Sequence, residues 1–329
     1  MMSKGRIFSG MRPTGRLHIG HLSVLENWVL LQKDYDCVYG IVDWHALTTA
    51  YENPEEIRYN TREMLLDWLS AGLDPEKSII MVQSHVKQHA ELHLLLSMMT
   101  PLSWLERVPT YKDQIQQLGK EGKDLSTYGF LGYPLLMTAD ILVYKADTVP
   151  VGEDQLPHLE LSREIARRFN YMYKKEIFPE PQAKLSKIPL LPGVDKRKMS
   201  KSYNNDIPIA SNKEEIEAKV RMMVTDPGRV KKDDPGNPEV CVVYTYHKIY
   251  NPSEVEEIGQ SCRQGTIGCV ACKKNLSRIL IKNLEPIWEK REYYAQRPQL
   301  LEEILATGNK KASQLAEKTM EEVREVLGV

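Results

Sequence analysis

The feature of this sequence that most constrains its fold is an alternation of apolar strands and amphipathic helices at the N-terminal end. Residues 6–10 ("RIFSG") and 37–45 ("CVYGIVDWH") are typical of buried strands. Between them, Leu22, Leu25 and Trp28 recur at helical spacing. A strand, a helix and a second strand within about forty residues predict a parallel crossover unit.

A third strand and the helix before it continue this alternation. The stretch 53–56 ("NPEE") predicts a helix start, because asparagine caps a helix, proline suits its first turn and acids favour the positive end of its dipole. We expect this helix to end at Gly72, and residues 78–84 ("SIIMVQS") are typical of the next strand. The alternation predicts an α/β fold with a doubly wound parallel sheet. The buried face of the helix is expected to be formed by Ile57, Met64, Leu65, Trp68 and Leu69.

The remainder of the chain is mainly helical in pattern. Residues 88–148 predict a helical insertion in the α/β domain, and after about residue 210 the alternation stops altogether. The residues beyond it predict helices that are interrupted at 233–239 ("DDPGNPE"). We therefore expect an α/β domain at 1–205, with its insertion at about 88–148, and a helical domain at 206–329.

The composition limits the classes of protein to which the chain can belong. Its formal net charge is −1, so no overall basic field indicates nucleic acid, and any basic surface has to be local. No run of about 18 apolar residues is present to cross a membrane. The opening residues, "MMSKGRIFSG", lack the apolar core of a secretory signal, so we expect a cytoplasmic protein.

A short histidine motif, His18-Ile19-Gly20-His21, enters the first predicted helix. A helix N-terminus offers free N–H groups and a positive dipole end to phosphate. Two histidines at this point would add donors for the charge that develops on a phosphoryl group under attack. Gly20 would let an adenine ring approach the backbone closely. On these four residues alone, a pair of ordinary polar loop histidines explains the motif as well.

A basic motif at the far end of the α/β domain supports the phosphate interpretation. Lys198-Met199-Ser200-Lys201-Ser202 places two lysines three positions apart, with serines between them. Such a loop suits a clamp on a pyrophosphate leaving group. A solvated basic loop is the simpler explanation of this motif by itself. It is improbable that both motifs occur by chance, each in the position that phosphate chemistry needs.

These two motifs resemble the signature pair of the class I aminoacyl-tRNA synthetases. Residues 132–142 ("GYPLLMTADIL") and 149–155 ("VPVGEDQ") are similar to the amino-acid pocket and nucleotide loop of the tryptophanyl branch of that family, and "DWHALTT" and "TDPGRV" resemble it as well. The resemblance extends from Arg6 to the terminal helix. It implies a Rossmann-like doubly wound sheet with a helical insertion, followed by a C-terminal helical domain that reads an anticodon.

The resemblance also implies a reaction and its partners. The chain would activate L-tryptophan with ATP and Mg²⁺ to tryptophanyl-adenylate and pyrophosphate. It would then transfer tryptophan to the 2′-hydroxyl of the 3′-terminal adenosine of tRNA(Trp). No protein nucleophile is needed, so catalysis would rest on positioning and charge stabilisation. The family is dimeric, and the insertion after residue 88 would form much of the interface. The implied catalytic residues are His18, His21, Lys198 and Lys201.

One buried acid is the main candidate for tryptophan recognition. Asp140 lies in an apolar stretch between Met137 and Ile141, where a carboxylate is costly unless it has a partner. It could be a helical aspartate satisfied by the backbone, but the resemblance implies that it accepts the indole N–H. The implied walls of the pocket are Phe8, Tyr133, Met137, Val149 and Val151, and the implied contacts to the polar end of the amino acid are His45 and Gln155.

The resemblance gives the ATP site in three pieces. A loop lies beneath the nucleotide, a second loop holds the ribose region, and the two motifs meet the phosphates. Many relatives carry glutamine at the first position of the first loop, where this chain has arginine. The implied ATP-binding residues are Arg12, Pro13, Thr14, Gly20, His21, Gly152, Glu153, Asp154, Lys198, Met199, Ser200, Lys201 and Ser202.

Four of the five cysteines form the pattern C-x20-C-x6-C-x2-C, at Cys241, Cys262, Cys269 and Cys272. Disulfides are rare in cytosolic proteins, so a metal site is favoured, and Cys37 is expected to be a core thiol. Zinc sites usually show two close cysteine pairs, whereas iron–sulfur clusters tolerate uneven spacing. Some tryptophanyl-tRNA synthetases are similar here, with a [4Fe–4S] cluster on C-x22-C-x6-C-x2-C. We rank a cluster first, zinc second and four free thiols third.

Basic residues near the cysteines could either offset the thiolate charge or contact the anticodon. Arg263, Lys273 and Lys274 would partly offset the thiolate charge. The anticodon-reading surface would use the same three residues together with Arg278, Lys310 and Lys311, although such charges are usually just a solvated face.

Three other functions remain open at this point. A tyrosyl-tRNA synthetase would share the fold and both motifs, although "LLMTADIL" and "GEDQ" favour tryptophan. A small-molecule adenylyltransferase uses a similar histidine loop but would lack the lysine motif and the helical tail. A non-enzymatic metal-cluster protein that binds RNA would explain the cysteines and leave both phosphate motifs without a role.

Overall fold

The computed structural model describes residues 4–109, 126–185 and 191–329 of the chain. The described residues form a parallel five-stranded sheet in the order β3-β2-β1-β4-β5. The strands are β1 (Arg6–Met11), β2 (Asp36–Ile41), β3 (Ser78–Val82), β4 (Thr148–Val151) and β5 (Gln182–Leu185). This is the doubly wound α/β arrangement that the alternating pattern predicted.

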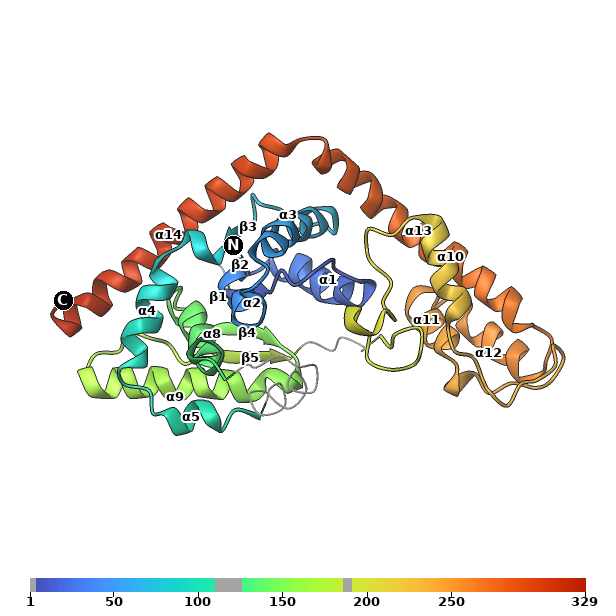
Figure 1. Cartoon of the computed structure of the whole chain (residues 1–329), viewed down its shortest axis with the longest axis horizontal. Coiled ribbons are helices and arrows are strands. Elements are labelled where there is room, and N and C mark those ends of the chain that lie inside the picture. Colours follow the sequence, from blue (N-terminus) through green and yellow to red (C-terminus); the bar gives the residue numbers. More distant parts are fainter. Residues whose placement is uncertain (1–3, 110–125, 186–190) are drawn as a thin grey trace.

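The sheet is buried on both faces, because successive strand residues point to opposite sides. Ile7 and Tyr39 join one apolar core, while Phe8 and Val38 join the other. The first core is completed by α1 (Leu22–Leu31) and α3 (Pro54–Ser70). The second is completed by α4 (Gln88–Ser97), α8 (Tyr133–Leu142) and α9 (Leu156–Tyr173). Figure 1 shows α3 above the sheet and α9 below it.

Short elements connect the larger ones within the α/β part of the chain. They are the helices α2 (Asp43–Ala50), α5 (Leu102–Glu106) and α7 (Tyr128–Leu131), and the 3₁₀ turns η1 (Ile19–His21), η2 (Gln83–His85), η3 (Glu153–Gln155) and η4 (Lys201–Tyr203). The predicted start and stop of α3 are confirmed: it begins at Pro54, and Gly72 follows it in a left-handed conformation with φ of 109°. All five residues predicted to form its inner face are buried, as is Cys37.

Two predicted strands end earlier than expected. The strand predicted at 78–84 ends at Val82, because Gln83 begins η2. The second strand ends at Ile41 and not at residue 45, because Asp43 begins α2. The first N–H groups of α2 are satisfied from a distant turn, since Gln83 Oε1 accepts from Trp44 N at 3.1 Å. Two strands were missed, β4 and β5. Each has only four residues, β4 contains Pro150 and β5 is largely polar, so neither carries an apolar pattern that predicts a strand.

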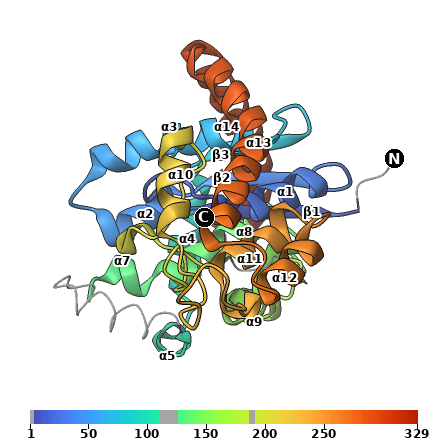
Figure 2. The same ribbon diagram turned by 90° about the vertical axis from the view of Figure 1, so that its right-hand side faces the viewer.

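The helical part of the chain begins after η4. It comprises α10 (Lys213–Met222), η5 (Pro238–Val240), α11 (Val242–Tyr250), α12 (Val255–Arg263), α13 (Cys269–Ala295) and α14 (Pro298–Leu327). Figure 2 shows α11 and α12 at the end of the molecule that faces the viewer. Helix α13 packs along α3, where Arg291 Nε lies 2.8 Å from the buried Asp67 Oδ1. None of the helices in the described ranges has the length and apolar character of a membrane span.

Helix α14 returns from the helical part to cover the open edge of the sheet at β3 (Figure 1). Asn309 Oδ1 accepts a hydrogen bond of 2.8 Å from Val82 N, a backbone donor that an edge strand would otherwise leave unpaired. Gly308 lies against the backbone of the same strand, and a Cβ at this position would be 1.8 Å from Ile80 O. The close approach of helix and strand therefore requires glycine here.

Gly308→Ala should lower the free energy of unfolding by about 3 kcal/mol, because overpacking against a backbone carbonyl forces α14 away from β3. Thermal or denaturant unfolding measures this loss. Gly129→Ala is the matched control, since Gly129 lies in α7 and a Cβ there meets nothing within 4 Å. The control should unfold as the wild type does or slightly later. Equal stability of the two variants would show that α14 does not need the close contact.

Candidate functional site

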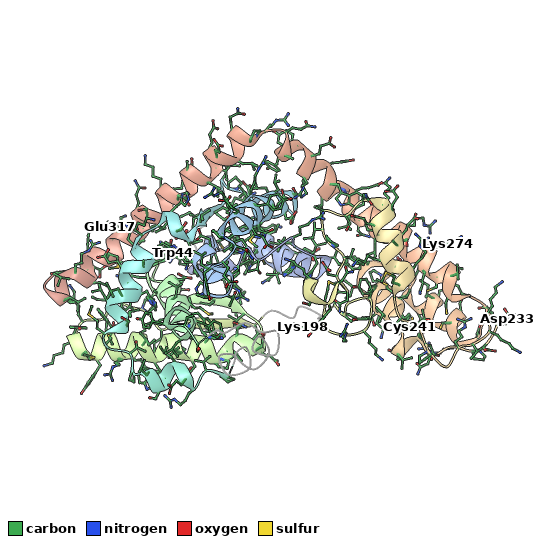
Figure 3. The ribbon with its side chains drawn as sticks, viewed as in Figure 1. Trp44, Lys198, Asp233, Cys241, Lys274 and Glu317 are labelled. Carbon is green, nitrogen blue, oxygen red and sulfur yellow. The ribbon has the colours of Figure 1, made fainter. Side chains whose placement is uncertain are left out.

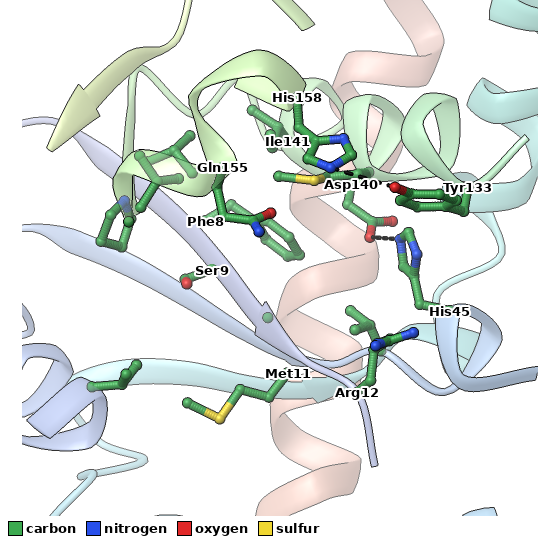
Figure 4. A pocket seen from close by; sticks show the side chains of 18 of the residues that line it. Phe8, Ser9, Met11, Arg12, His45, Tyr133, Asp140, Ile141, Gln155 and His158 are labelled. Atoms are coloured by element: carbon green, nitrogen blue, oxygen red, sulfur yellow. Dashed lines mark hydrogen bonds and ion pairs between the residues drawn. The ribbon is translucent and has the colours of Figure 1, made fainter. Parts of the chain in front are cut away.

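A cavity of about 430 Å³ opens at the carboxyl ends of β1 and β4. In an open parallel sheet this is the switch point of the strand order, where ligands usually bind. All eight residues predicted to meet the amino acid line this one cavity, and so do Arg12 and Gly152 from the predicted ATP site (Figure 4). The lining residues that the sequence did not single out are Ser9, Gly10, Met11, Val24, Trp28, Val42, Thr48, Phe130, Ile141, Pro150 and His158.

Asp140 is the buried acid of this cavity, with only 2% of its surface exposed. Its Oδ1 accepts from His89 Nδ1 at 2.7 Å and from Gln83 Nε2 at 2.7 Å. Its Oδ2 accepts from His45 Nε2 at 3.0 Å and again from Gln83 Nε2 at 2.9 Å. Side chains from α2, η2 and α4 therefore satisfy the carboxylate. Asp140 is therefore not the helical aspartate satisfied by backbone groups that was the alternative explanation from the sequence.

The same partners fix the charge of the acid. Burial alone would raise the pKa of the Asp140 carboxyl, but the neighbouring His89 and His45 outweigh burial and lower that pKa to about 2. The group is therefore a carboxylate at neutral pH, and a carboxylate can only accept hydrogen bonds. The predicted contact of His45 is with the polar end of the amino acid, and in this structure its Nε2 lies 3.0 Å from Asp140 Oδ2 (Figure 4).

Tyr133 and His158 lie beside Asp140 (Figure 4). Tyr133 Oη lies 3.4 Å from His158 Nε2, and burial lowers the pKa of His158 to about 4, so this ring is neutral at physiological pH. Farther from the acid, Gln155 Nε2 donates to Asp154 Oδ2 at 3.0 Å on η3. Arg12 is exposed beside the cavity and supplies a permanent positive charge there. The cavity thus offers an ionised acceptor at Asp140 and further polar and charged groups at η3 and Arg12.

The histidine motif forms η1 and leads directly into α1. The backbone N–H of His18 donates to His21 Nδ1 at 3.2 Å, so the proton of a neutral His21 ring sits on Nε2. Burial, together with nearby positive charge, lowers the pKa of His18 to about 4 and that of His21 to about 3. Both rings are therefore neutral donors at pH 7. A Cβ on Gly20 would lie 3.0 Å from His18 Nδ1, so glycine keeps this surface open.

The backbone of the lysine motif is held by Asn205, a residue that no sequence pattern indicated. Asn205 Oδ1 accepts from Ser200 N at 2.8 Å, and its Nδ2 donates to Lys198 O at 3.1 Å. Lys201 Nζ donates to Thr14 O at 3.2 Å, which joins the motif to the loop after β1. Burial lowers the pKa of Lys201 to about 8. The side chain of Ser202 lies outside the part of the chain that the structure describes.

The parallel sheet, the cavity at its switch point and the two motifs beside it together match a known family. Residues 2–285 match the family described as tRNA synthetases class I (W and Y). The chain belongs to this family. The synthetase is 53% identical to the tryptophan–tRNA ligase of Thermotoga maritima, over 98% of this chain and 99% of the relative. It is 45% identical to that of Aquifex aeolicus, over 98% of this chain and 100% of the relative.

A solved structure agrees with the assignment. The synthetase is similar to tryptophanyl-tRNA synthetase from Campylobacter jejuni, whose crystal structure is a complex with ADP and tryptophan. The TM-score is 0.89 and the sequences are 32% identical, with 98% of this chain and 100% of that chain covered. The resemblance first indicated by the two motifs therefore extends over the whole catalytic and helical parts of the synthetase.

The four cysteines come together in the helical part of the synthetase. Cys241 precedes α11, Cys262 lies near the end of α12, and Cys269 and Cys272 lie in the first turn of α13. All four line one small cavity, although in the described residues no three metal-binding side chains are placed to hold a single ion. The thiols affect one another, since burial and then the other three cysteines raise the pKa of Cys272 to about 12.

The cation at these thiols is not one of those predicted. Arg229 Nη1 lies 3.9 Å from the Sγ of Cys262 and 3.9 Å from that of Cys269. By contrast, Lys273 Nζ donates to Arg221 O at 2.7 Å, and Arg263 lies 3.5 Å from Glu239. These two residues therefore have partners other than the thiols, and Arg229 is a cation in contact with them. Arg229 was missed because it lies in a loop 33 positions before Cys262.

Proposed function

We infer that the synthetase is a tryptophan–tRNA ligase. It activates tryptophan with ATP to tryptophanyl-adenylate and pyrophosphate, and it then transfers tryptophan to the 3′-terminal adenosine of tRNA(Trp). The observation that carries this inference is an ionised, buried acid in a largely apolar cavity at the carboxyl end of β1, the strand whose following loop carries the histidine motif. Relatives with this activity that are 45% and 53% identical over the whole chain support it.

For the amino-acid site, we propose that the indole ring enters the cavity with its N–H toward Asp140. Phe8, Met137, Val149 and Val151 then contact the faces of the ring. All four lone-pair positions of the carboxylate already have donors, so one donor has to yield to the indole. Gln83 and His89 are fully buried behind the acid, whereas His45 lines the cavity. His45 is therefore the partner that turns away from Oδ2.

For the nucleotide, we propose that the phosphates lie over η1, between the histidine and lysine motifs. An oxygen of the tryptophan carboxylate attacks the α-phosphorus, a new P–O bond forms, and the bond to the bridging oxygen breaks so that pyrophosphate leaves. His18 and His21 donate as neutral rings to the charge that develops on the α-phosphate. Lys198 and Lys201 attract the leaving pyrophosphate. The second loop would hold the ribose with Gly152, Glu153 and Asp154, and Arg12, Pro13 and Thr14 would lie beneath the nucleotide.

Magnesium enters this proposal with the nucleotide. Mg²⁺ is usually bound by substrate phosphates and one or two carboxylates at most, and it neutralises phosphate charge. The described side chains fit that mode, because no three of the metal-binding type are grouped at the phosphates or elsewhere. The chain itself contributes positioning: Thr14 O and Asn205 hold Lys201 and the backbone of its motif beside η1.

ATP–pyrophosphate exchange tests the activity. Exchange of labelled pyrophosphate into ATP should depend on tryptophan and Mg²⁺, and tyrosine should not replace tryptophan. The reason is geometric: tyrosine carries its O–H donor at the tip of a single ring, whereas indole carries its N–H on the edge of a fused ring, so a cavity that fits indole does not bring the phenol O–H to the same position on Asp140. Equal exchange with tyrosine would refute the choice of substrate and leave the reaction class intact.

We also propose that Cys241, Cys262, Cys269 and Cys272 hold a [4Fe–4S] cluster. A zinc ion needs four ligands at about 2.3 Å from one point, and the described thiols are not grouped that closely. A cluster is larger, and its ligands stand farther apart around it. The shared cavity wall and the Arg229 guanidinium between two thiols support this assignment, because the cation offsets thiolate charge. When bound, the cluster would act as a structural staple without a redox step.

Anaerobically purified protein should be brown, with a broad absorbance band and roughly four irons per chain. Cys269→Ser should lose the colour and the iron, and it should impair tRNA charging more than tryptophan activation. Cys37→Ser is the control, because Cys37 is a buried core thiol in β2, and its iron content should equal that of the wild type. Stoichiometric zinc without iron in the same preparation would reject the cluster.

We propose that the helical part, predicted at 206–329, contacts the tRNA anticodon. Exposed cations on α13, Lys274 and Arg278, support this role (Figure 3). Lys310 and Lys311 do not belong to that surface, because they lie on α14, which packs along β3. Removing Arg278 and Lys274 together should weaken tRNA binding and its salt dependence, and unchanged binding would exclude this face.

We propose that the synthetase is a homodimer joined through the insertion after residue 88. Three exposed apolar side chains in this insertion support this: Leu94 on α4, Met98 just after it and Leu102 at the start of α5, which are 55%, 74% and 62% exposed. Light scattering should give twice the chain mass of 37.8 kDa. A single-chain mass at micromolar concentration would contradict the proposal.

A further inference from the structure

Behind Asp140 lies a chain of fully buried polar groups that the activity described above does not use. His89, on α4, places Nδ1 2.7 Å from Asp140 Oδ1 and Nε2 2.7 Å from Tyr144 Oη. Both His89 and Tyr144 have 0% of their surface exposed, so neither can touch a ligand in the cavity. Buried polar groups are costly unless they are hydrogen-bonded. Here both ring nitrogens of His89 have a partner, and so does the Tyr144 hydroxyl.

The direction of these hydrogen bonds follows from the charge of the acid. An ionised carboxylate only accepts, so His89 Nδ1 carries a proton and donates to Asp140. His89 Nε2 and Tyr144 Oη share the second hydrogen bond, in which a neutral ring accepts and a protonated ring donates. Burial raises the pKa of Tyr144 well above its ordinary value, so the hydroxyl keeps its proton. Tyr144, His89 and Asp140 are thus joined in one unbroken chain of hydrogen bonds.

This chain also determines which oxygen of Asp140 faces the cavity. His89 holds Oδ1, and Oδ2 is left on the side of His45, the one partner of the acid that lines the cavity. Tyr144 has a second contact to the site, because its ring stacks on Phe8 with centroids 5.5 Å apart and an interplanar angle of 18°. One tyrosine therefore supports both the acid and an apolar wall of the cavity.

We propose that His89 and Tyr144 are positioning residues for indole recognition: they hold the Asp140 carboxylate with Oδ2 toward the cavity and Phe8 against the ring of the substrate. The proposal rests on the role of Asp140 given above. It predicts that removing the tyrosine hydroxyl alone, at a distance from the substrate, weakens discrimination between tryptophan and an analogue that lacks the indole N–H. A residue with a merely structural role would lower stability without changing that discrimination.

The test compares ATP–pyrophosphate exchange with tryptophan and with β-(3-benzothienyl)alanine, in which sulfur replaces the N–H. The measured quantity is the ratio of the two kcat/KM values. Tyr144→Phe keeps the stacked ring and should lower this ratio by about tenfold, the scale of leaving one buried polar group, here His89 Nε2, without its hydrogen-bond partner. His89→Leu should lower it further, and His89→Asn should recover part of the loss, because its amide keeps a donor near the Nδ1 position. The KM for ATP should stay at the wild-type value in all three.

Tyr246→Phe is the matched control. Tyr246 is fully buried as well, and its hydroxyl donates to Pro192 O at 2.7 Å, away from the cavity. This variant should keep the wild-type ratio. If the wild type itself does not prefer tryptophan, the role of Asp140 falls and this proposal falls with it. If the wild type discriminates and Asp140→Ala does not, but Tyr144→Phe and His89→Asn both keep the wild-type ratio, only the positioning proposal is overturned.

Discussion

Asp140→Ala should lower kcat/KM for tryptophan on the order of 10⁴-fold while leaving the KM for ATP close to that of the wild type. The substitution removes the one carboxylate at the closed end of the cavity, where a site built to read an N–H loses most when its acceptor is lost. It also leaves the donors of Gln83, His89 and His45 without their shared partner. Exchange kinetics with tryptophan and ATP varied separately measure both effects.

Two further variants separate recognition from folding. Asp140→Asn keeps the shape of the side chain but presents an amide, so it should lose much of the tryptophan activity without opening a cavity. Asp67→Asn is the matched control, because Asp67 is an equally buried carboxylate whose partner, Arg291, lies on α13. This control should lower thermal stability and keep the preference for tryptophan over the benzothienyl analogue. Wild-type kcat/KM in Asp140→Ala would show that the acid is structural.

The sequence could predict those parts of the site whose residues form a short continuous stretch of the chain, namely the two phosphate motifs. The histidine motif needs one helix start, and the lysine motif needs one loop, so each is visible as a short string of letters. Strand and helix periodicity likewise predicted the sheet, because β1, β2 and β3 are apolar and bounded by clear turn residues. The lining of the cavity followed from the resemblance, since no periodicity distinguishes a core residue from one that contacts a ligand.

The rest of the site depends on contacts between distant segments. Gln83 lies 57 positions from Asp140 and His89 lies 51, and neither sits in a pattern that marks it as a partner of a buried acid. The packing of α4 against α8 brings His89 to Asp140, and Gln83 reaches the acid from η2. Arg229 is likewise distant from Cys262 in the sequence, whereas Asn205 lies only five positions from Ser200 but contacts backbone atoms, which no side-chain pattern indicates. A buried charge in a sequence therefore indicates that partners exist, and the fold alone identifies them.

Lys201→Ala should slow adenylate formation by about 10²-fold or more, the scale on which one donor to a developing charge contributes. Tryptophan binding measured without ATP should hardly change, because Lys201 contacts Thr14 O and does not line the tryptophan cavity. Single-turnover formation of the adenylate measures the first effect, and equilibrium binding of tryptophan measures the second. Lys213→Ala is the control, since Lys213 is an exposed lysine paired with Glu285, and it should leave both unchanged.

The pH dependence of the same reaction identifies the group. The pKa of Lys201 is lowered to about 8 by burial, so the free enzyme loses the ammonium charge as the pH rises through that value. Because kcat/KM for ATP reports on the free enzyme, it should fall above about pH 8 in the wild type. Lys201→Arg keeps its charge at any accessible pH, so it should retain part of the activity and lose this alkaline decline.

The histidine motif cannot cause the decline, because His18 and His21, with pKa values of about 4 and 3, are already neutral. A decline that persists unchanged in Lys201→Arg would assign it to another group and remove Lys201 from the phosphate site.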